Sequence, residues 1–336
     1  MKSAELVGIR EFRIVDQELS APGPGQVQVR VAAVGICGSD LHNYTEGGIG
    51  DSPCRYPMVL GHEPAGVVLK TGPGVTGLAA GDRFALEPAM PCGQCRSCLM
   101  GRPNLCDHMR FMSSGGIPGF FREAVNLPAH NLIPVPAYVG LAEATLVEPL
   151  AVALHSLTFA AVKPGETAIV FGTGPIGLLT IAALKFAGAG RVWAVEPVAA
   201  RRAMAKMMGA DDVLDTTGPL SGIPLVDIAF DCAGGEDTVN QCIAALNKGG
   251  RLVYTAIPAA VHVPFHAPGL RKKEITFFNV YRSNHQTERA RDLLAAHLNL
   301  FAPLVTHTRP LDQIGQAFDL VVRQADGVGK MIVTPG

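Results

Sequence analysis

The 336-residue sequence predicts an α/β protein with two domains, a small irregular β barrel and a doubly wound parallel sheet. The length exceeds that of a usual single domain, so two hydrophobic cores are expected. In the first half, short β segments are separated by glycine and proline. From Pro164 onward, strand-like runs alternate with helix-length segments, which is typical of parallel sheets.

The first domain is expected over residues 1–150. Alternating or continuous apolar residues predict strands at 26–34, 58–70 and 82–87. Glycine and proline between these runs predict loops rather than helices. Because the strands are short and the loops many, the sequence favours a compact, irregular barrel.

The second domain is expected over residues 151–283, where about six apolar strands alternate with helices. A C-terminal tail, residues 284–336, is expected to pack back on the first domain. The predicted strands are 167–172, 191–196, 211–216, 226–234, 251–257 and 274–280, with helices at 175–188 and 199–209. In the tail, helices are predicted at 287–298 and 314–323, and strands at 303–311 and 330–336.

Composition excludes several kinds of partner. The formal net charge is -1 and only 17% of residues are charged, so no basic stripe is available for nucleic acid. The first residues lack a basic stretch followed by an apolar run, and no apolar stretch is long enough to span a membrane. We therefore expect a cytoplasmic protein without a membrane partner.

A glycine pattern predicts a dinucleotide site. Gly172, Gly174 and Gly177 form GxGxxG between an apolar strand and an apolar helix, where they allow a tight turn and close approach to a pyrophosphate. Glu196 ends the next strand and can accept hydrogen bonds from ribose hydroxyls, which favours NAD over NADP. Arg201 and Arg202 nearby could accommodate a 2′-phosphate, so NADP stays open. The alternative is an ordinary turn with an exposed glutamate.

Four cysteines, Cys92, Cys95, Cys98 and Cys106, lie close together within a lobe at about 88–108. Four thiolates can enclose a zinc ion completely, which is typical of a structural site. The alternative is a set of free or redox-active thiols.

A second, scattered set predicts a catalytic zinc site: Cys37, His62 and either Glu63 or Glu148. One thiolate, one imidazole and one carboxylate leave a fourth position for water or substrate. Taken singly, a cysteine or a loop histidine is more often an ordinary structural residue. The sequence leaves open which glutamate is the third ligand.

These motifs together resemble the zinc-containing medium-chain alcohol dehydrogenase family, particularly its polyol (sorbitol-like) and threonine dehydrogenase branches. The likeness rests on GICGSDLH, LGHEPAG, the VEP segment, the four-cysteine lobe and GTGPIG. It implies a GroES-like catalytic domain, interrupted by a Rossmann domain, with two zinc ions per chain. It also implies that Ser39 and His42 relay a proton, and that Glu148 lies close to the zinc, as a ligand or through its water.

The resemblance further implies an NAD-dependent enzyme that moves hydride from a secondary hydroxyl of a polyol or sugar alcohol, giving a ketone. A threonine-type amino alcohol dehydrogenase and an inactive NAD- and zinc-binding sensor are the alternatives, and a homodimer or homotetramer is expected. The implied cofactor-binding residues are Gly172, Gly174, Pro175, Ile176, Gly177, Glu196, Arg201, Val280 and Tyr281. Asn43 and the order Tyr281–Arg282 depart from the sorbitol branch, so the substrate pocket cannot be transferred.

Overall fold

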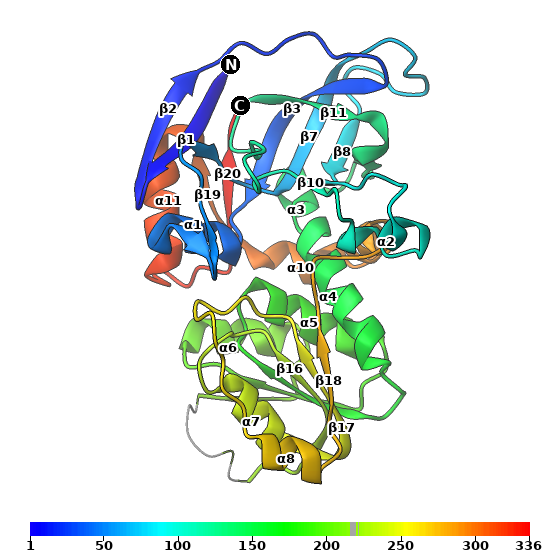
Figure 1. Cartoon of the computed structure of the whole chain (residues 1–336), viewed down its shortest axis with the longest axis vertical. Coiled ribbons are helices and arrows are strands. Elements are labelled where there is room, and N and C mark those ends of the chain that lie inside the picture. Colours follow the sequence, from blue (N-terminus) through cyan, green and yellow to red (C-terminus); the bar gives the residue numbers. More distant parts are fainter. Residues whose placement is uncertain (216–219, 221) are drawn as a thin grey trace. The chain divides into compact units, whose positions relative to one another are not determined.

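The computed structural model describes residues 1–215, 220 and 222–336. The chain forms two compact units, one of Met1–Glu148 together with Thr287–Gly336, and one of Pro149–Gln286 (Figure 1). Among the described residues, no helix is both long and apolar enough to cross a membrane.

A seven-stranded sheet forms the centre of the first unit, with strand order β12-β8-β7-β3-β20-β19 and β11 paired to β3. The long strand β3 pairs with β7, β11 and β20, and its β-branched residues Val27, Val29 and Val31 are fully buried. The strands are β3 (Gln26–Gly35), β7 (Glu63–Thr71), β8 (Arg83–Leu86), β11 (Ala124–Pro128), β12 (Leu132–Pro134), β19 (Val305–Pro310) and β20 (Lys330–Thr334).

Smaller elements surround this sheet. They are the three-stranded sheet β1 (Lys2–Gly8), β2 (Glu11–Asp16) and β6 (Met58–Val59), the pairs β4 (Gly48–Ile49)/β5 (Ser52–Pro53) and β9 (Ala89–Met90)/β10 (Arg110–Phe111), and the helices α1 (Gly38–Glu46), α2 (Arg96–Leu99), α3 (Leu141–Ala144), α9 (Thr287–Ala296), α10 (Leu298–Phe301) and α11 (Ile314–Val322). Short 3-10 turns occupy Pro103–Leu105, Ala129–Asn131, Ala302–Leu304 and Leu311–Gln313.

An aromatic cluster fixes α1 against the C-terminal helix. The rings of Tyr44 and Phe318 have centroids 5.0 Å apart, and Phe12 and Phe121 also pack on Phe318. Tyr44 is 2% exposed. Because α1 carries several of the predicted site residues, this packing determines where they lie.

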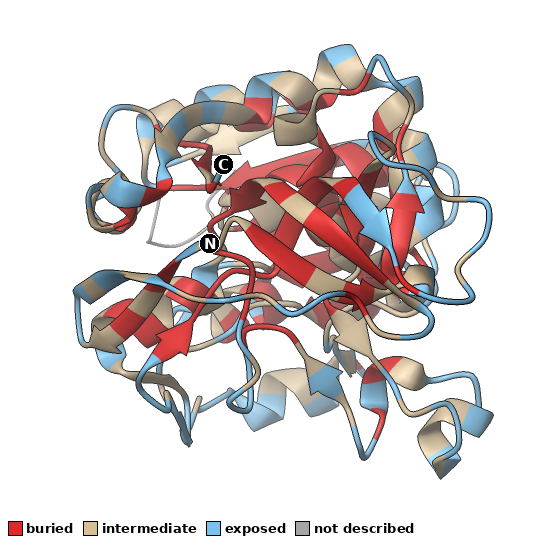
Figure 2. Cartoon of the chain, turned by 90° about the horizontal axis from the view of Figure 1, so that it is seen from above, coloured by how far each residue is buried: buried red, intermediate tan, exposed pale blue. Residues whose placement is uncertain are grey.

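The second unit contains a six-stranded parallel sheet of order β15-β14-β13-β16-β17-β18. Its elements are α4 (Val147–Ala160, which begins in the first unit), β13 (Thr167–Phe171), α5 (Pro175–Phe186), β14 (Arg191–Val195), α6 (Ala199–Met207), β15 (Asp212–Leu214), β16 (Val226–Asp231), α7 (Thr238–Ala245), β17 (Leu246–Tyr254), α8 (Ala267–Lys272) and β18 (Thr276–Asn279). This strand order is that of a doubly wound dinucleotide-binding sheet, so the predicted fold class is confirmed. Its central strands β13 and β16 are mostly buried. In the first unit, buried residues likewise gather on the strands beside the two marked termini in Figure 2. Thr216, the last residue of the predicted strand 211–216, lies outside the described residues.

The predicted strand at 58–70 was wrong in one respect. It is two strands, β6 and β7, separated by Leu60–His62. Gly61 adopts φ +91° there, a conformation that breaks a strand and is open mainly to glycine. The interruption turns the chain at His62, one of the predicted metal ligands.

Candidate active site

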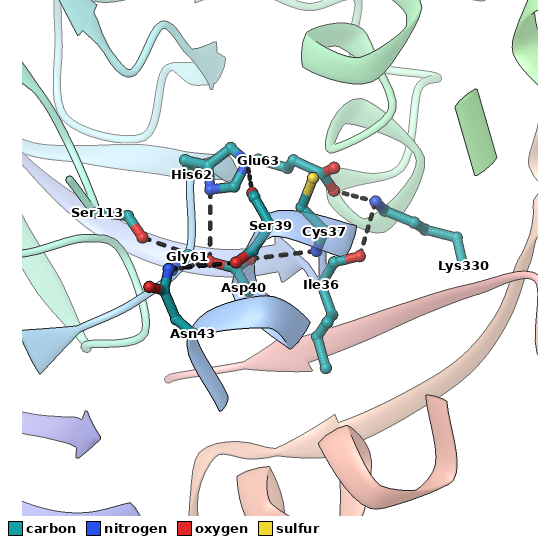
Figure 3. A network of polar contacts seen from close by, with 10 residues as sticks. All are labelled: Ile36, Cys37, Ser39, Asp40, Asn43, Gly61, His62, Glu63, Ser113 and Lys330. Atoms are coloured by element: carbon teal, nitrogen blue, oxygen red, sulfur yellow. Dashed lines mark hydrogen bonds and ion pairs between the residues drawn. The ribbon is translucent and has the colours of Figure 1, made fainter. Parts of the chain in front are cut away.

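Three predicted metal ligands come together in the first unit. The ligand atoms of Cys37, His62 and Glu63 all lie within 4.8 Å of one another (Figure 3). Cys37 follows the end of β3 and precedes α1, while Glu63 opens β7 and pairs in register with Gly35. The β3–β7 pairing therefore places Glu63 beside Cys37, although the two residues are far apart in sequence.

Asp40, on the first turn of α1, connects two of these ligands. It is 1% exposed, and its carboxylate accepts hydrogen bonds from the backbone N–H of Cys37 (3.1 Å) and of Gly61 (3.2 Å). Its Oδ1 also lies 3.5 Å from His62 Nδ1 and 3.4 Å from the hydroxyl of Ser113. A carboxylate at Nδ1 orients the imidazole and leaves Nε2 for a metal.

The charges of this pair depend on each other. Burial alone would lower the pKa of His62, but Asp40 and the Cys37 thiol raise it well above its usual value. Burial likewise raises the pKa of Asp40, yet His62 and the backbone donors lower it overall. Because a metal takes the neutral imidazole, zinc binding here displaces a proton.

Glu63 is paired with a lysine that the sequence analysis missed. Lys330, the first residue of β20, forms an ion pair with Glu63 Oε2, and the two side chains are 2% and 1% exposed. Lys330 Nζ also donates to the carbonyl of Ile36 at 2.9 Å. A Cβ at Gly35 would collide with the Glu63 carboxylate and lie 2.6 Å from Lys330 Cε. The pair therefore occupies the space that this glycine leaves free.

Ser39 lies next to the metal ligands. Its Oγ is 3.4 Å from His62 Nε2, the nitrogen that faces away from Asp40. His42, one turn later on α1, has its Nδ1 3.0 Å from Glu46. The structure thus places Ser39 beside the ligand cluster and His42 on the outer part of the same helix.

Glu148 lies in the first turn of α4 and is half-buried. It is not part of the 4.8 Å ligand group. Burial raises the pKa of its carboxyl to about 8; Glu63 and Glu87 add to this, while His62 and Lys330 oppose it. Glu148 is therefore electrostatically linked to the ligand cluster without belonging to it.

Glu87, at the end of β8, is a further carboxylate that the sequence analysis missed. It accepts hydrogen bonds from the backbone N–H of Ala89 at 3.2 Å and from the hydroxyl of Thr287 at 2.7 Å. Thr287 opens α9, where the chain returns to the first unit. In the sequence, the local indication of this residue was the Glu87–Pro88 pair at the end of a predicted strand.

The four predicted lobe cysteines also come together, with all sulfur atoms within 4.8 Å of one another. The Cys95 and Cys106 sulfurs are 3.8 Å apart, and no disulfide joins them. Sulfurs at about 2.3 Å from a tetrahedral zinc lie roughly 3.8 Å apart, so the lobe fits this ion. Backbone N–H donors of Gln94 and Cys95 lower the pKa of Cys92 to about 7, which favours the thiolate that a metal binds.

The glycine pattern of the second unit has the predicted geometry. Gly172 has φ +81°, and a Cβ there would lie 2.8 Å from Ala233. A Cβ at Gly177 would collide with the Gly172 carbonyl, whereas nothing lies within 4 Å of one at Gly174, the N-cap of α5. The helix N-terminus is thus without close neighbours at Gly174, which suits the approach of a pyrophosphate.

The predicted ribose-binding residue, Glu196, is 4% exposed and held by backbone donors. Its Oε2 accepts from Thr173 N at 2.9 Å and its Oε1 from Val198 N at 3.0 Å. Burial lowers the pKa of the Arg201 guanidinium, and the nearby Glu196 carboxylate partly offsets this by raising it. These residues therefore gather around the end of β14.

The remaining cofactor candidates lie in the same unit. Pro175 and Ile176 open α5. Val280 follows β18 and donates its N–H to the carbonyl of Tyr254 at 3.0 Å. Tyr281 is 55% exposed, with the guanidinium carbon of Arg282 4.7 Å from its ring centroid.

A parallel dinucleotide-binding sheet, an open set of Cys, His and carboxylate ligands, and a closed four-cysteine set define a class of protein. They describe a dehydrogenase that uses a nicotinamide dinucleotide together with zinc.

Comparison with known proteins narrows this class. Residues 23–137 match the alcohol dehydrogenase GroES-like domain, and residues 175–296 match the zinc-binding dehydrogenase model. Sorbitol dehydrogenase of Bacillus subtilis is 31% identical, over 100% of this chain and 97% of that protein. The chain belongs to the zinc-containing medium-chain alcohol dehydrogenase family, in its polyol branch, as the sequence predicted.

Solved structures agree. L-idonate 5-dehydrogenase of Escherichia coli superposes with a TM-score of 0.92 at 27% identity, covering 99% of this chain and 97% of that one. An alcohol dehydrogenase of Escherichia coli CFT073, complexed with NADH, superposes with a TM-score of 0.90 at 27% identity and 99% coverage of both chains.

Proposed function

We propose that this protein oxidises a secondary hydroxyl of a polyol or sugar alcohol to a ketone and reduces NAD. The observation that carries the proposal is the convergence of Cys37, His62 and Glu63, a ligand set that leaves one metal position open. Similarity to sorbitol and L-idonate dehydrogenases supports a substrate with neighbouring hydroxyl groups.

When bound, zinc supplies Lewis acidity that makes the substrate hydroxyl easier to deprotonate, and NAD supplies the hydride acceptor. The chain's own residues have distinct tasks in this scheme. Asp40 keeps His62 in the orientation that presents Nε2. Ser39 Oγ, 3.4 Å from that nitrogen, would accept the hydroxyl proton while releasing its own, and His42 would pass a proton from this relay to solvent.

We further propose that Glu63 is the third protein ligand and that Glu148 is an acid–base group outside the ligand set. The proposal is supported by the 4.8 Å grouping, which includes Glu63 and omits Glu148. The raised pKa of Glu148, about 8, suits a carboxyl that exchanges a proton near neutral pH.

The test follows the absorbance of reduced cofactor with NAD and with NADP over polyols, sugar alcohols, aldonates, L-threonine and simple alcohols. The protein is assayed as purified, after chelation, and after zinc is restored. Turnover of a polyol with NAD that returns only with zinc supports the proposal. Bound NADH and two zinc ions without any turnover would instead identify a sensor, and turnover of L-threonine alone would identify an amino alcohol dehydrogenase.

The cytoplasmic location and the homodimer or homotetramer expected from the sequence stay predictions. Cell fractionation and sedimentation analysis of the purified protein check them.

A further inference from the structure

The Glu196 carboxylate has few hydrogen-bond acceptor positions left for a ligand. An ionised carboxylate can accept about four hydrogen bonds. Three positions are filled within the protein, by the N–H of Thr173, the hydroxyl of Thr173 at 3.2 Å and the N–H of Val198. A ribose diol offers two hydroxyl donors, so one more position is needed than Glu196 has free.

The side chain of Thr173 can provide that position. Its Oγ1 lies 3.2 Å from Glu196 Oε2 and 3.3 Å from the carbonyl oxygen of Arg201, near the start of α6. A hydroxyl has one proton and donates to one acceptor at a time. Rotation toward Arg201 therefore frees a site on Glu196 without leaving the hydroxyl unpaired.

The exchange of hydrogen-bond partners by Thr173 takes place between buried groups. Thr173 is 0% exposed and Glu196 is 4% exposed, so water cannot easily replace a lost partner. Thr173 stands between Gly172 and Gly174, so its hydroxyl links the glycine turn to the carboxylate of Glu196.

We propose that Thr173 is a positioning residue for the adenosine ribose. Its hydroxyl holds the Glu196 carboxylate in place before the cofactor binds and turns to the Arg201 carbonyl when the ribose diol arrives. A ribose with a 2′-phosphate has one hydroxyl fewer and fits the one free position of Glu196, so only NAD requires the exchange. This inference rests on the proposed function, because it requires that the chain bind NAD.

The test measures cofactor binding without substrate, by fluorescence titration of NADH and of NADPH. Thr173→Val removes the hydroxyl and keeps the shape, so binding no longer has to exchange the bond to the charged Glu196 for a weaker bond to the Arg201 carbonyl. We therefore expect NADH to bind about three- to tenfold more tightly. NADPH binding should change less than twofold, and Thr173→Ser should bind NADH as the wild type does. Thr180→Val is the matched control, since Thr180 is equally buried on α5 without a hydrogen bond to Glu196.

A merely structural role of Thr173 would change NADH and NADPH binding by the same factor or weaken both, and either result would overturn the inference. In the Glu196→Gln background, Thr173→Val should have little further effect on NADH, because the carboxylate it positions is gone. If the wild type binds NADH and Thr173→Val binds it equally well, only this inference fails. If the wild type binds neither cofactor, the proposed function fails with it.

Discussion

Replacing Lys330 with methionine tests which glutamate binds the metal. Methionine has nearly the length of lysine without its charge, so packing against Gly35 changes little while Glu63 loses its counter-ion. Both members of the pair are at most 2% exposed, so solvent screens their interaction little. Removing one partner of a buried ion pair costs about 3–5 kcal/mol, because the other charge stays buried without compensation.

This cost should depend on zinc. If Glu63 is a ligand, the metal compensates its charge and the zinc-loaded variant loses less stability than the chelated one. A difference of about 2 kcal/mol between the two states corresponds to roughly 30-fold tighter zinc binding by Lys330→Met, by the thermodynamic cycle. The cysteine lobe does not distort the comparison, since variant and wild type both contain it.

Hydrogen exchange measured peptide by peptide is the suitable assay. Peptides from β3 and β20 report the first unit, and peptides from β13 and β16 provide an internal reference in the second. The double variant Glu63→Gln/Lys330→Met is the control, since an uncharged pair should recover much of the lost stability. Equal losses with and without zinc would refute the assignment of Glu63 as a metal ligand.

Three further substitutions have defined outcomes. Cys98→Ala should reduce bound zinc from two ions to one per chain by elemental analysis while NADH titration is unchanged; two retained ions would show that the lobe is not a zinc site. Gly177→Ala should weaken NADH binding at least tenfold, because its Cβ collides with the Gly172 carbonyl and shifts the phosphate turn; unchanged titration would contradict this. Lys273→Met should lower the free energy of unfolding by about 1–2 kcal/mol, because Lys273 donates to three carbonyls at the end of α7 at 2.8–2.9 Å. Trp193 fluorescence follows the unfolding, and Lys272→Met is the control.

Local patterns predicted much of this protein. The glycine turn and the cysteine lobe are each contained in a short stretch, so their chemistry could be recognised before the fold was known. The alternation of apolar strands and helices after Pro164 likewise predicted the parallel sheet. Strand ends were predicted less well. The predicted strand at 58–70 is interrupted at Gly61, because the apolar pattern on both sides gives no sign of a turn that requires positive φ.

Non-local partners could not be predicted in this way. Lys330 donates to a carbonyl 294 positions earlier, and nothing in KMIVTPG distinguishes it from a lysine at the start of any strand. The hydrogen bond between Thr287 and Glu87 spans 200 positions. Asp40 was adjacent to predicted ligands, but its contact with His62 depends on how α1 packs through Tyr44. Such contacts follow from the tertiary fold, which local sequence does not specify.

The same connectivity determines when the metal site becomes complete. Cys37, His62 and Glu63 come from the first 63 residues, yet the counter-ion of Glu63 lies on the last strand, β20. β20 reaches β3 only after the second unit has been synthesised and the chain has returned at Thr287. Until then Glu63 lacks its ion pair with Lys330, and its burial is more costly unless a metal is bound. The last strand therefore contributes to the first unit not only sheet pairing but also the charge balance on which the metal-free active site depends.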